Sequence, residues 1–291
     1  MKKNKGDISF DILNYIFLGL VGFICLYPML YVLFASLSDS NLLMAHEGVL
    51  LKPLGFNIGA YQKVIENPTV YVGYRNTLFV MVVGLLVNMA LTSLGAYFLS
   101  RKRVYFKNLI MGFILFTMYF NGGLIPTYMV VKSVGLDNSL WALILPTAVS
   151  TYNLIIMRTG FAAIPESLHE AAIIDGANEF QIMVRIYIPL VKATLAVIVL
   201  YYAVAHWNSW FQAAIYLSDR DKYPLQLVLR EILISNDISS MSNSATSSDS
   251  ASIAMSIKYA TIMVATLPIL VIYPFVQKYF VGGVMLGSVK E

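Results

Sequence analysis

Long uncharged apolar runs alternate with short polar segments along this chain of 291 residues. Each run is near or above the ~20 residues that one helix needs to cross the hydrocarbon of a bilayer. Helices are the expected form because unpaired backbone groups are costly in lipid, and the runs lack the alternating pattern of barrel strands. The pattern predicts an all-α polytopic membrane protein with six transmembrane helices, at residues 12–37, 77–99, 109–131, 140–157, 193–217 and 253–276.

Composition supports a membrane protein, since 58% of the residues are hydrophobic and only 12% are charged, against roughly 25% charged residues in an average soluble domain. The first run follows Lys2, Lys3 and Lys5, as the apolar region of a secretory signal does. It is longer than the ~7–15 apolar residues of such a signal, and we interpret it as an uncleaved helix. The single cysteine, Cys25, lies in this run and is predicted to be a small buried residue.

The distribution of lysine and arginine predicts the orientation, because basic residues of short loops stay on the cytoplasmic side. The dense cluster from Arg101 to Lys107 follows the second crossing, which predicts that both termini lie in the cytoplasm. The net charge of +4 needs no nucleic-acid partner, since anionic membrane lipid attracts such clusters. The expected organisation is a cytoplasmic N-terminus (1–11), a transmembrane domain (12–276) with an inner loop (158–192) and two outer loops (38–74 and 218–252), and a cytoplasmic tail (277–291).

Several kinds of active chemistry are missing from the sequence. The phosphate-binding pattern G-x-x-x-x-G-K-[ST] does not occur, so the chain is not expected to bind a nucleotide in that way. The three histidines, His46, His169 and His206, are scattered, and we expect no catalytic residue, no metal site and no bound cofactor. No charged residue lies deep inside a predicted crossing, whereas ion-driven transporters use such buried groups. These absences argue against an enzyme and against self-powered transport.

The inner loop carries signals for a helix, a turn and a second helix. Pro165 suits a first helical position, and Gly176 can adopt the left-handed conformation that often ends a helix. Asn178 and Gln181 have the spacing of a capping box for the second helix. That helix would carry an apolar stripe at positions i, i+3, i+4 and i+7, formed by Phe180, Met183, Val184 and Tyr187.

Two interpretations of this helical hairpin remain open from the residues alone. It could lie on the lipid headgroups, which Arg185 and Lys192 would favour. Alternatively, the small side chains of Ala171 and Ala172 let the surface of a partner protein come close, while neighbouring apolar residues help to fill a groove.

The hairpin resembles the signature loop of permease subunits in binding-protein-dependent ABC importers, which reads Glu-Ala-Ala, three residues, Gly, nine residues, Ile, one residue, a Leu-like residue and Pro. Here Ile188 stands at the Leu-like position. In that family the loop forms a coupling helix that docks in a cleft of a separate ATPase subunit. The resemblance implies that the ATPase-coupling residues are Glu170, Ala171, Ala172, Asp175, Gly176, Ile186 and Pro189.

The resemblance extends to the carbohydrate branch, typified by the smaller permease subunit of maltose importers. Residues 75–78, 96–101 and 277–291 fit that branch, and residues 122–126 and 224–234 look similar to permeases for oligosaccharide or polysaccharide fragments. The resemblance implies a sugar substrate, a second homologous permease subunit, two ATPase subunits that use ATP and Mg, and an extracytoplasmic solute-binding protein as receptor. Two alternatives of other classes are an ion-coupled secondary transporter and a non-transporting membrane assembly factor.

Two polar segments have roles only through this resemblance. The tail, in which Gly282, Gly283 and Gly287 predict flexibility, would reach the ATPase interface, although Glu291 replaces the usual terminal glycine. The alternative is a frayed terminus. The outer loop at 218–252 has a possible short helix from Pro224 to Ile234 and a serine-rich, mobile end, and it would touch the receptor. The alternative is a solvated spacer without contact.

Aromatic and amide residues on two predicted crossings are candidates for the substrate path. Aromatic faces can stack on a sugar ring while amides bond its hydroxyl groups. Polar residues in membrane helices also bond neighbouring helices without touching a substrate, and this alternative stays open. The candidates are Tyr152 and Asn153 on the fourth crossing, and Tyr202, His206, Trp207 and Asn208 on the fifth.

Overall fold

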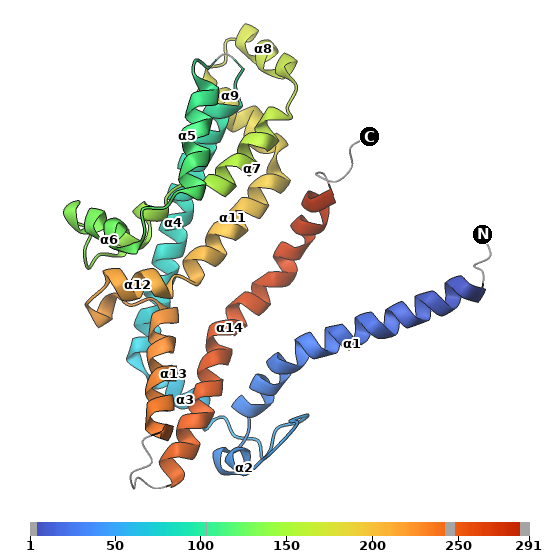
Figure 1. Ribbon diagram of the computed structural model, residues 1–291, viewed down its shortest axis with the longest axis vertical. Coiled ribbons are helices and arrows are strands. Elements are labelled where there is room, and N and C mark those ends of the chain that lie inside the picture. Colours follow the sequence, from blue (N-terminus) through green and yellow to red (C-terminus); the bar gives the residue numbers. More distant parts are fainter. Residues whose placement is uncertain (1–4, 103, 242–247, 286–291) are drawn as a thin grey trace. The chain divides into compact units, whose positions relative to one another are not determined.

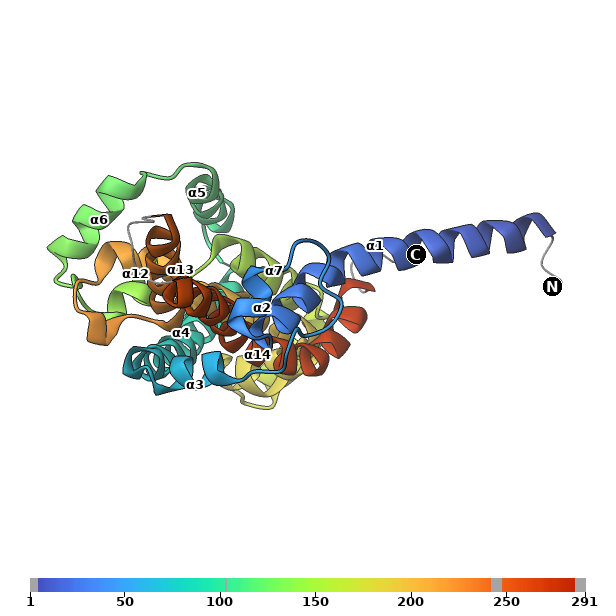
Figure 2. The same ribbon diagram turned by 90° about the horizontal axis from the view of Figure 1, so that it is seen from below.

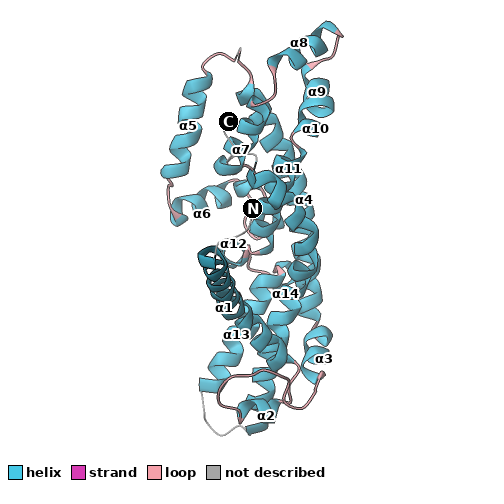
Figure 3. Cartoon of the chain, turned by 90° about the vertical axis from the view of Figure 1, so that its right-hand side faces the viewer, coloured by secondary structure: helices cyan, strands magenta, loops and turns pink. Residues whose placement is uncertain are grey.

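The computed structural model describes residues 5–102, 104–241 and 248–285, and every regular element in these residues is a helix (Figure 3). The all-α prediction is confirmed. The first part contains α1 (Lys5–Ser36), α2 (Ser40–Met44), α3 (Gly59–Glu66), α4 (Pro68–Ser100), α5 (Lys107–Tyr119), α6 (Leu124–Ser133) and the 3-10 helices η1 (Leu140–Leu143) and η2 (Leu145–Thr147). The second part contains α7 (Thr151–Ala162), α8 (Glu166–Ile174), α9 (Glu179–Ile182), the π-helix η3 (Met183–Tyr187), α10 (Ile188–Leu190), α11 (Lys192–Trp207), α12 (Trp210–Tyr216), η4 (Arg220–Lys222), α13 (Leu225–Met241) and α14 (Ser248–Met285).

Three described helices are each long and apolar enough to cross a membrane, namely residues 10–36 of α1, all of α4, and residues 255–274 of α14. The other candidate spans are bent helix pairs: α5 with α6 at 115°, η1 and η2 with α7 at 49°, and residues 179–190 with α11 at 89°. Figures 1 and 2 show α5 and α6 as separate helices that point in different directions. Counting each pair as one span gives up to six crossings, the number that the apolar runs predict.

The bends fall where the backbone leaves the helical region, which hydropathy does not report. Between α5 and α6, Phe120 is extended and Gly123 has a φ of +91°. Ser150 is extended at the start of α7, and its hydroxyl accepts a hydrogen bond from the backbone N–H of Asn153. The predicted fifth crossing at 193–217 is also interrupted, because α11 ends at Trp207 and α12 begins at Trp210.

The chain divides into two compact units, of which the first comprises residues 1–70 and 229–268. Its core contains Ala35, Leu43 and Leu50, and the ring of Tyr31 meets that of Tyr259 with centroids 5.9 Å apart. In contrast, the most apolar stretch of α1 has none of its residues buried. Cys25 is therefore exposed rather than buried. That prediction was wrong because an apolar helix in a membrane can be solvated by lipid tails instead of by protein.

The second unit comprises residues 71–228 and 269–291, and α4 borders two hydrophobic clusters within it. One cluster surrounds the C-terminal part of α4, where the rings of Tyr97, Phe161 and Tyr187 meet edge to face with centroids 5.1–6.2 Å apart. The other surrounds Val80 and is built mainly from η1, α12 and the residues that follow each of them. These clusters hold the two candidate sites described below.

The helix bounds change two predictions, one about the loop at 218–252 and one about the C-terminal tail. The short helix expected from Pro224 to Ile234 is the start of a longer helix, α13. The flexible glycines expected at Gly282 and Gly283 lie within α14, which ends at Met285. Residues 242–247 of the serine-rich segment and residues 286–291 of the tail lie outside the described residues.

Candidate coupling and substrate sites

The predicted inner loop contains a helix with a complete C-terminal cap. In α8, the N–H of Gly176 donates to the carbonyl of Ile173 at 2.9 Å, and the N–H of Ala177 donates to the carbonyl of Ala172 at 3.0 Å. This pair of bonds is the Schellman motif, which needs a left-handed residue between its two turns. Gly176 supplies it with a φ of +80°. The sequence therefore located the end of this helix correctly.

The second inner helix begins as predicted but does not continue as predicted. The side chain of Asn178 accepts from the N–H of Gln181, and the Gln181 side chain accepts from the N–H of Asn178, so the capping box is present. A π-turn, η3, follows at once. The expected apolar stripe is split: Met183 and Tyr187 are buried, whereas Phe180, which precedes the π-turn, is 65% exposed.

The predicted coupling residues divide between two faces of the inner hairpin. Ala172 is buried, and Ile186 packs against the core of the second unit. The remaining predicted residues are exposed: Glu170, Ala171, Asp175, Gly176 and Pro189. Between them lies Ile174, whose side chain is 84% exposed. The hairpin thus anchors one face on its own helices and presents small, acidic and apolar groups on the other.

A cluster of polar side chains ties α8 and α9 to the end of α4. Arg101, the residue after α4, contacts Glu166 of α8 at 2.6 Å and donates to the hydroxyl of Tyr187. The hydroxyl of Tyr97 donates to Glu179, and Nε2 of His169 lies 3.2 Å from the same carboxylate. These six residues form what we call the α4 clamp: Tyr97, Arg101, Glu166, His169, Glu179 and Tyr187.

Hydrogen bonds fix the ionisation of one clamp residue. Burial by itself would raise the pKa of Glu179, but hydrogen bonds from Tyr97 and His169 outweigh it and lower the pKa below its ordinary value. Glu179 is thus ionised at neutral pH. Sequence reasoning placed Arg101 in a basic inner cluster and in the stretch 96–101 of the family resemblance, but it missed the clamp, since the partners of Arg101 are 65 and 86 positions away in the chain.

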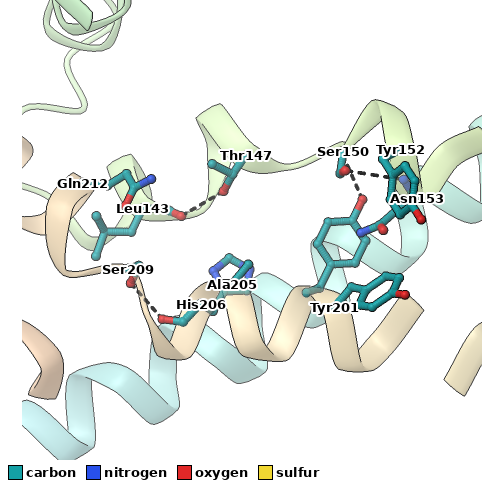
Figure 4. A pocket seen from close by; sticks show the side chains of 11 residues that line it. Leu143, Thr147, Ser150, Tyr152, Asn153, Tyr201, Ala205, His206, Ser209 and Gln212 are labelled. Atoms are coloured by element: carbon teal, nitrogen blue, oxygen red, sulfur yellow. Dashed lines mark hydrogen bonds between the residues drawn. The ribbon is translucent and has the colours of Figure 1, made fainter. Parts of the chain in front are cut away.

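A cavity of about 400 Å³ opens between α7, the 3-10 turns before it, and α11 with the start of α12 (Figure 4). Four of the six predicted substrate-path residues line it, namely Tyr152, Asn153, Tyr202 and His206. The lining residues that sequence reasoning missed are Leu143, Thr147, Ser150, Tyr201, Ala205, Ser209 and Gln212. Hydroxyl, amide and aromatic groups dominate this wall, and no carboxylate or lysine or arginine side chain is among the lining residues.

Two of the lining side chains use their polar groups to hold neighbouring helices. His206 Nε2 lies 2.7 Å from Oδ1 of Asn88 on α4, and the Asn88 amide donates to the carbonyls of Thr147 and Ala148 at 2.9 Å. The hydroxyl of Tyr202 lies 2.8 Å from that of Thr92. These bonds join α4, α11 and the turn before α7 into one wall.

Other lining groups face the cavity with free surface. The ring of Tyr152 is 52% exposed and lies 6.1 Å from that of Tyr201, centroid to centroid. Gln212 is also exposed, and Figure 4 shows its amide on the cavity side of the helix after the break. Periodicity along a single straight crossing could not place Gln212, because the break at residues 208–209 changes the helix direction.

The remaining two predicted substrate-path residues lie outside the cavity lining. The ring of Trp207 packs edge to face on Tyr74 with centroids 6.4 Å apart. The amide of Asn208 donates to the carbonyl of Val204 at 3.0 Å and so caps the end of α11. Both side chains have a structural role in this arrangement.

The segment at 218–252, predicted to be an outer loop, begins with a hydrogen-bonded corner. Asn138 bonds the backbone N–H of Ser218 and of Asp219 at 3.1 Å, and its amide donates to the Asp219 carboxylate at 2.8 Å. Lys222 also contacts this carboxylate at 2.8 Å. Hydrogen bonds from Lys222 and Asn138 lower the pKa of Asp219. The loop therefore leaves the second unit from a rigid, charged start.

Comparison with known proteins gives consistent matches along the whole chain. Residues 1–285 match the family described as "Binding-protein-dependent transport system inner membrane component". Protein LplC of Bacillus subtilis is 41% identical over 100% of this chain and 98% of its own length. The polygalacturonan/rhamnogalacturonan transport system permease protein YtcP of the same organism is 42% identical over 97% of this chain and 98% of its own length.

A solved structure matches equally well in three dimensions. A chain of a bacterial ABC transporter involved in the import of the acidic polysaccharide alginate superposes with a TM-score of 0.87 at 30% identity, covering 96% of this chain and 99% of that one. The predicted six-crossing architecture and the resemblance of the inner loop agree with these matches.

Proposed function

Because this chain belongs to the family of binding-protein-dependent transport system inner membrane components, we propose that it carries fragments of acidic polysaccharides across the bacterial inner membrane. It is a multi-pass permease subunit of an ABC importer for sugars, and it is a transport component rather than an enzyme. The relative named for polygalacturonan and rhamnogalacturonan and the structural neighbour that imports alginate support oligosaccharides of uronic acids as the substrate class.

The cavity beside α7 and α11 forms part of the substrate path in this proposal. Its free aromatic surface on Tyr152 and Tyr201 suits stacking on sugar rings, and the amides of Asn153 and Gln212 suit hydroxyl groups. Because the cavity wall carries no cation from lysine or arginine, this chain would hold the neutral parts of the sugar. The carboxylates would then be recognised by the second permease subunit or the receptor.

The exposed face of the inner hairpin is the proposed docking surface for the ATPase. Ala171 leaves space for close approach, Ile174 offers an apolar contact, and Glu170 and Asp175 offer charges. Such a mixture suits an edge of a protein interface better than a lipid surface, which favours basic residues. The buried face, anchored through the α4 clamp, would transmit the movement of the ATPase to the crossings.

The assembly would contain this chain, a second homologous permease subunit, two ATPase subunits that use ATP and Mg, and an extracytoplasmic solute-binding protein. Both termini would lie in the cytoplasm. The outer loops at 38–74 and 218–252 would face the receptor, and the tail at 277–291 would face the ATPase. This chain would provide none of the residues that bind ATP.

Reconstitution of the complex purified through this chain tests the proposal. The solute-binding protein, loaded with oligogalacturonate, is added to the complex in lipid nanodiscs, and ATP hydrolysis is measured. We expect stimulation by oligogalacturonate or alginate oligosaccharides and none by maltose oligosaccharides, which serve as the uncharged control. Stimulation by maltose oligosaccharides alone would refute the substrate class. Accumulation of solute in vesicles that contain only this chain would refute the importer assignment and favour a secondary transporter.

A further inference from the structure

The helix α4 is bonded to both candidate sites of the second unit. Near its C-terminal end, Tyr97 and the following Arg101 hold α8 and α9 through the α4 clamp. About one and a half turns before Tyr97, Thr92 bonds Tyr202, and about one turn before that, Asn88 bonds His206 as well as the turn before α7. Asn88, Thr92 and Tyr97 belong to this one continuous helix, and Arg101 directly follows its last residue.

We propose that α4 acts as the connecting rod between the coupling hairpin and the substrate cavity, with Tyr97 and Arg101 as the positioning residues that attach the rod to the hairpin. This inference rests on the proposed function, in which the hairpin docks on the ATPase. It adds the route by which the cavity and the docking surface respond to each other, and it assigns that route to side chains outside the signature loop.

Geometry favours α4 over its neighbours for this role. The distance from Asn88 to Arg101 along the helix is about 20 Å, from thirteen residues at ~1.5 Å each. Over this length α4 is α-helical up to Ser100, whereas the third, fourth and fifth candidate spans are all bent by more than 40°. An unbroken helix moves as one body, while a bent pair can change its angle.

Burial makes the two attachments firm. Asn88 and Thr92 have no exposed surface, and the hydroxyl of Tyr97 reaches Glu179 from a ring that is 8% exposed. The Arg101 guanidinium lies over the rings of Tyr97 and Tyr187 at 5.7 and 5.4 Å from their centroids. Hydrogen bonds to ionised partners are stronger than bonds between neutral groups, so relative movement of α4 and the hairpin would break several contacts at once.

Packing between the two attachments leaves little room for α4 to slide. A Cβ atom added at Gly95 would lie 3.1 Å from Cδ1 of Leu154 on α7, so the two helices are already in close contact there. Movement of the hairpin would therefore carry α4 with it, and the bonds of Asn88 and Thr92 would carry the cavity wall. The same coupling would run in reverse when sugar enters the cavity, because energetic coupling between sites is reciprocal.

The test uses Tyr97→Phe, which removes only the hydroxyl, and Arg101→Gln, which removes the guanidinium, in the nanodisc complex. Tyr105→Phe, at a ring that is 88% exposed, is the matched control for the hydroxyl. Arg185→Gln, at an exposed arginine of η3 outside the clamp, is the matched control for the charge. Basal ATP hydrolysis, hydrolysis with the receptor loaded with galacturonate or alginate oligosaccharide, and thermal unfolding are measured on each complex.

We expect the clamp variants to keep basal hydrolysis and to lose stimulation by the loaded receptor by at least about fivefold, the lower range of known coupling between sites. Stimulation equal to that of the two controls would overturn the proposal. A parallel loss of basal hydrolysis and of thermal stability would also overturn it, because the clamp would then only hold the hairpin in place. If the wild-type complex shows no stimulation with either sugar, the proposed function itself fails, and this inference falls with it.

Discussion

Gly176 offers a sharp test of the coupling hairpin because its role can be separated from its surroundings. A Cβ atom added at this position would meet nothing within 4 Å in this chain, so a substitution meets no clash within it. Its φ of +80° is the only local obstacle. Left-handed backbone costs an L-residue about 1–2 kcal/mol, least for asparagine and most for a β-branched residue.

The predicted order of damage therefore follows backbone preference and not side-chain size. Gly176→Asn should be tolerated best, Gly176→Ala should be intermediate, and Gly176→Val should be worst. About 1–2 kcal/mol changes the ratio of capped to frayed α8 by roughly 5- to 30-fold. Fraying would release the two backbone bonds that Gly176 and Ala177 donate to the end of α8. If the end of α8 is frayed, the hairpin cannot transmit the movement of the ATPase to the crossings.

Uptake of oligosaccharide and receptor-stimulated ATP hydrolysis measure this effect, with membrane insertion and complex assembly as controls. We expect Gly176→Val to abolish import while the chain still inserts. If Gly176→Asn is more harmful than Gly176→Ala, damage follows volume, and contact with the ATPase rather than backbone strain determines the role of Gly176. Normal uptake by Gly176→Val would refute the assignment of this hairpin as the coupling element.

Three further predictions follow from single contacts. Gly84→Ala should destabilise the protein by about 1–3 kcal/mol in thermal unfolding, because the added Cβ would lie 2.5 Å from Nε2 of His206. The control is Gly112→Ala, whose added Cβ would meet nothing within 4 Å. Tyr152→Ala should weaken the apparent affinity for oligosaccharide several-fold and Tyr152→Phe much less, since the exposed ring supplies the stacking surface. If the two variants transport oligosaccharide equally well, Tyr152 does not belong to the substrate path. Glu179→Gln should lower thermal stability at pH 7 by less than about 1 kcal/mol, because the side chain is 61% exposed. Since the pKa of Glu179 is lowered from 4.5 in the folded protein, the wild-type advantage should be complete above pH 4.5 and disappear as the pH falls through the folded pKa; an advantage that grows toward low pH would contradict this.

The polar residues of the predicted substrate path show how one sequence pattern can serve two roles. Tyr202 and His206 line the cavity, yet their polar atoms bond Thr92 and Asn88. Tyr152 lies on the same cavity with its ring exposed. Variants of Tyr202 and His206 are therefore expected to change stability as well as transport, whereas variants of Tyr152 should change transport alone.

Sequence information was sufficient wherever one segment determined its own structure. Apolar run length predicted the membrane crossings, because the bilayer itself requires that length. The glycine at 176 and the Asn178–Gln181 box predicted a helix end and a helix start, since caps involve residues within a few positions of each other. The signature spacing of the inner loop is a property of one segment in the same way.

Tertiary structure alone decided the rest, for a physical reason that particular residues make clear. The π-turn after Ile182 begins and ends at residues that pack in the core, Met183 and Tyr187, and sequence reasoning did not predict it. Arg101 meets Glu166 across 65 positions, and His206 meets Asn88 across 118. Such contacts depend on how bent helices pack against α4. Hydropathy indicates whether a helix lies in the membrane, but it does not show which other helices it contacts. The chain's sequence therefore specified a membrane-spanning permease and its coupling hairpin, while packing determined the cavity and the clamp that connects α4 to that hairpin.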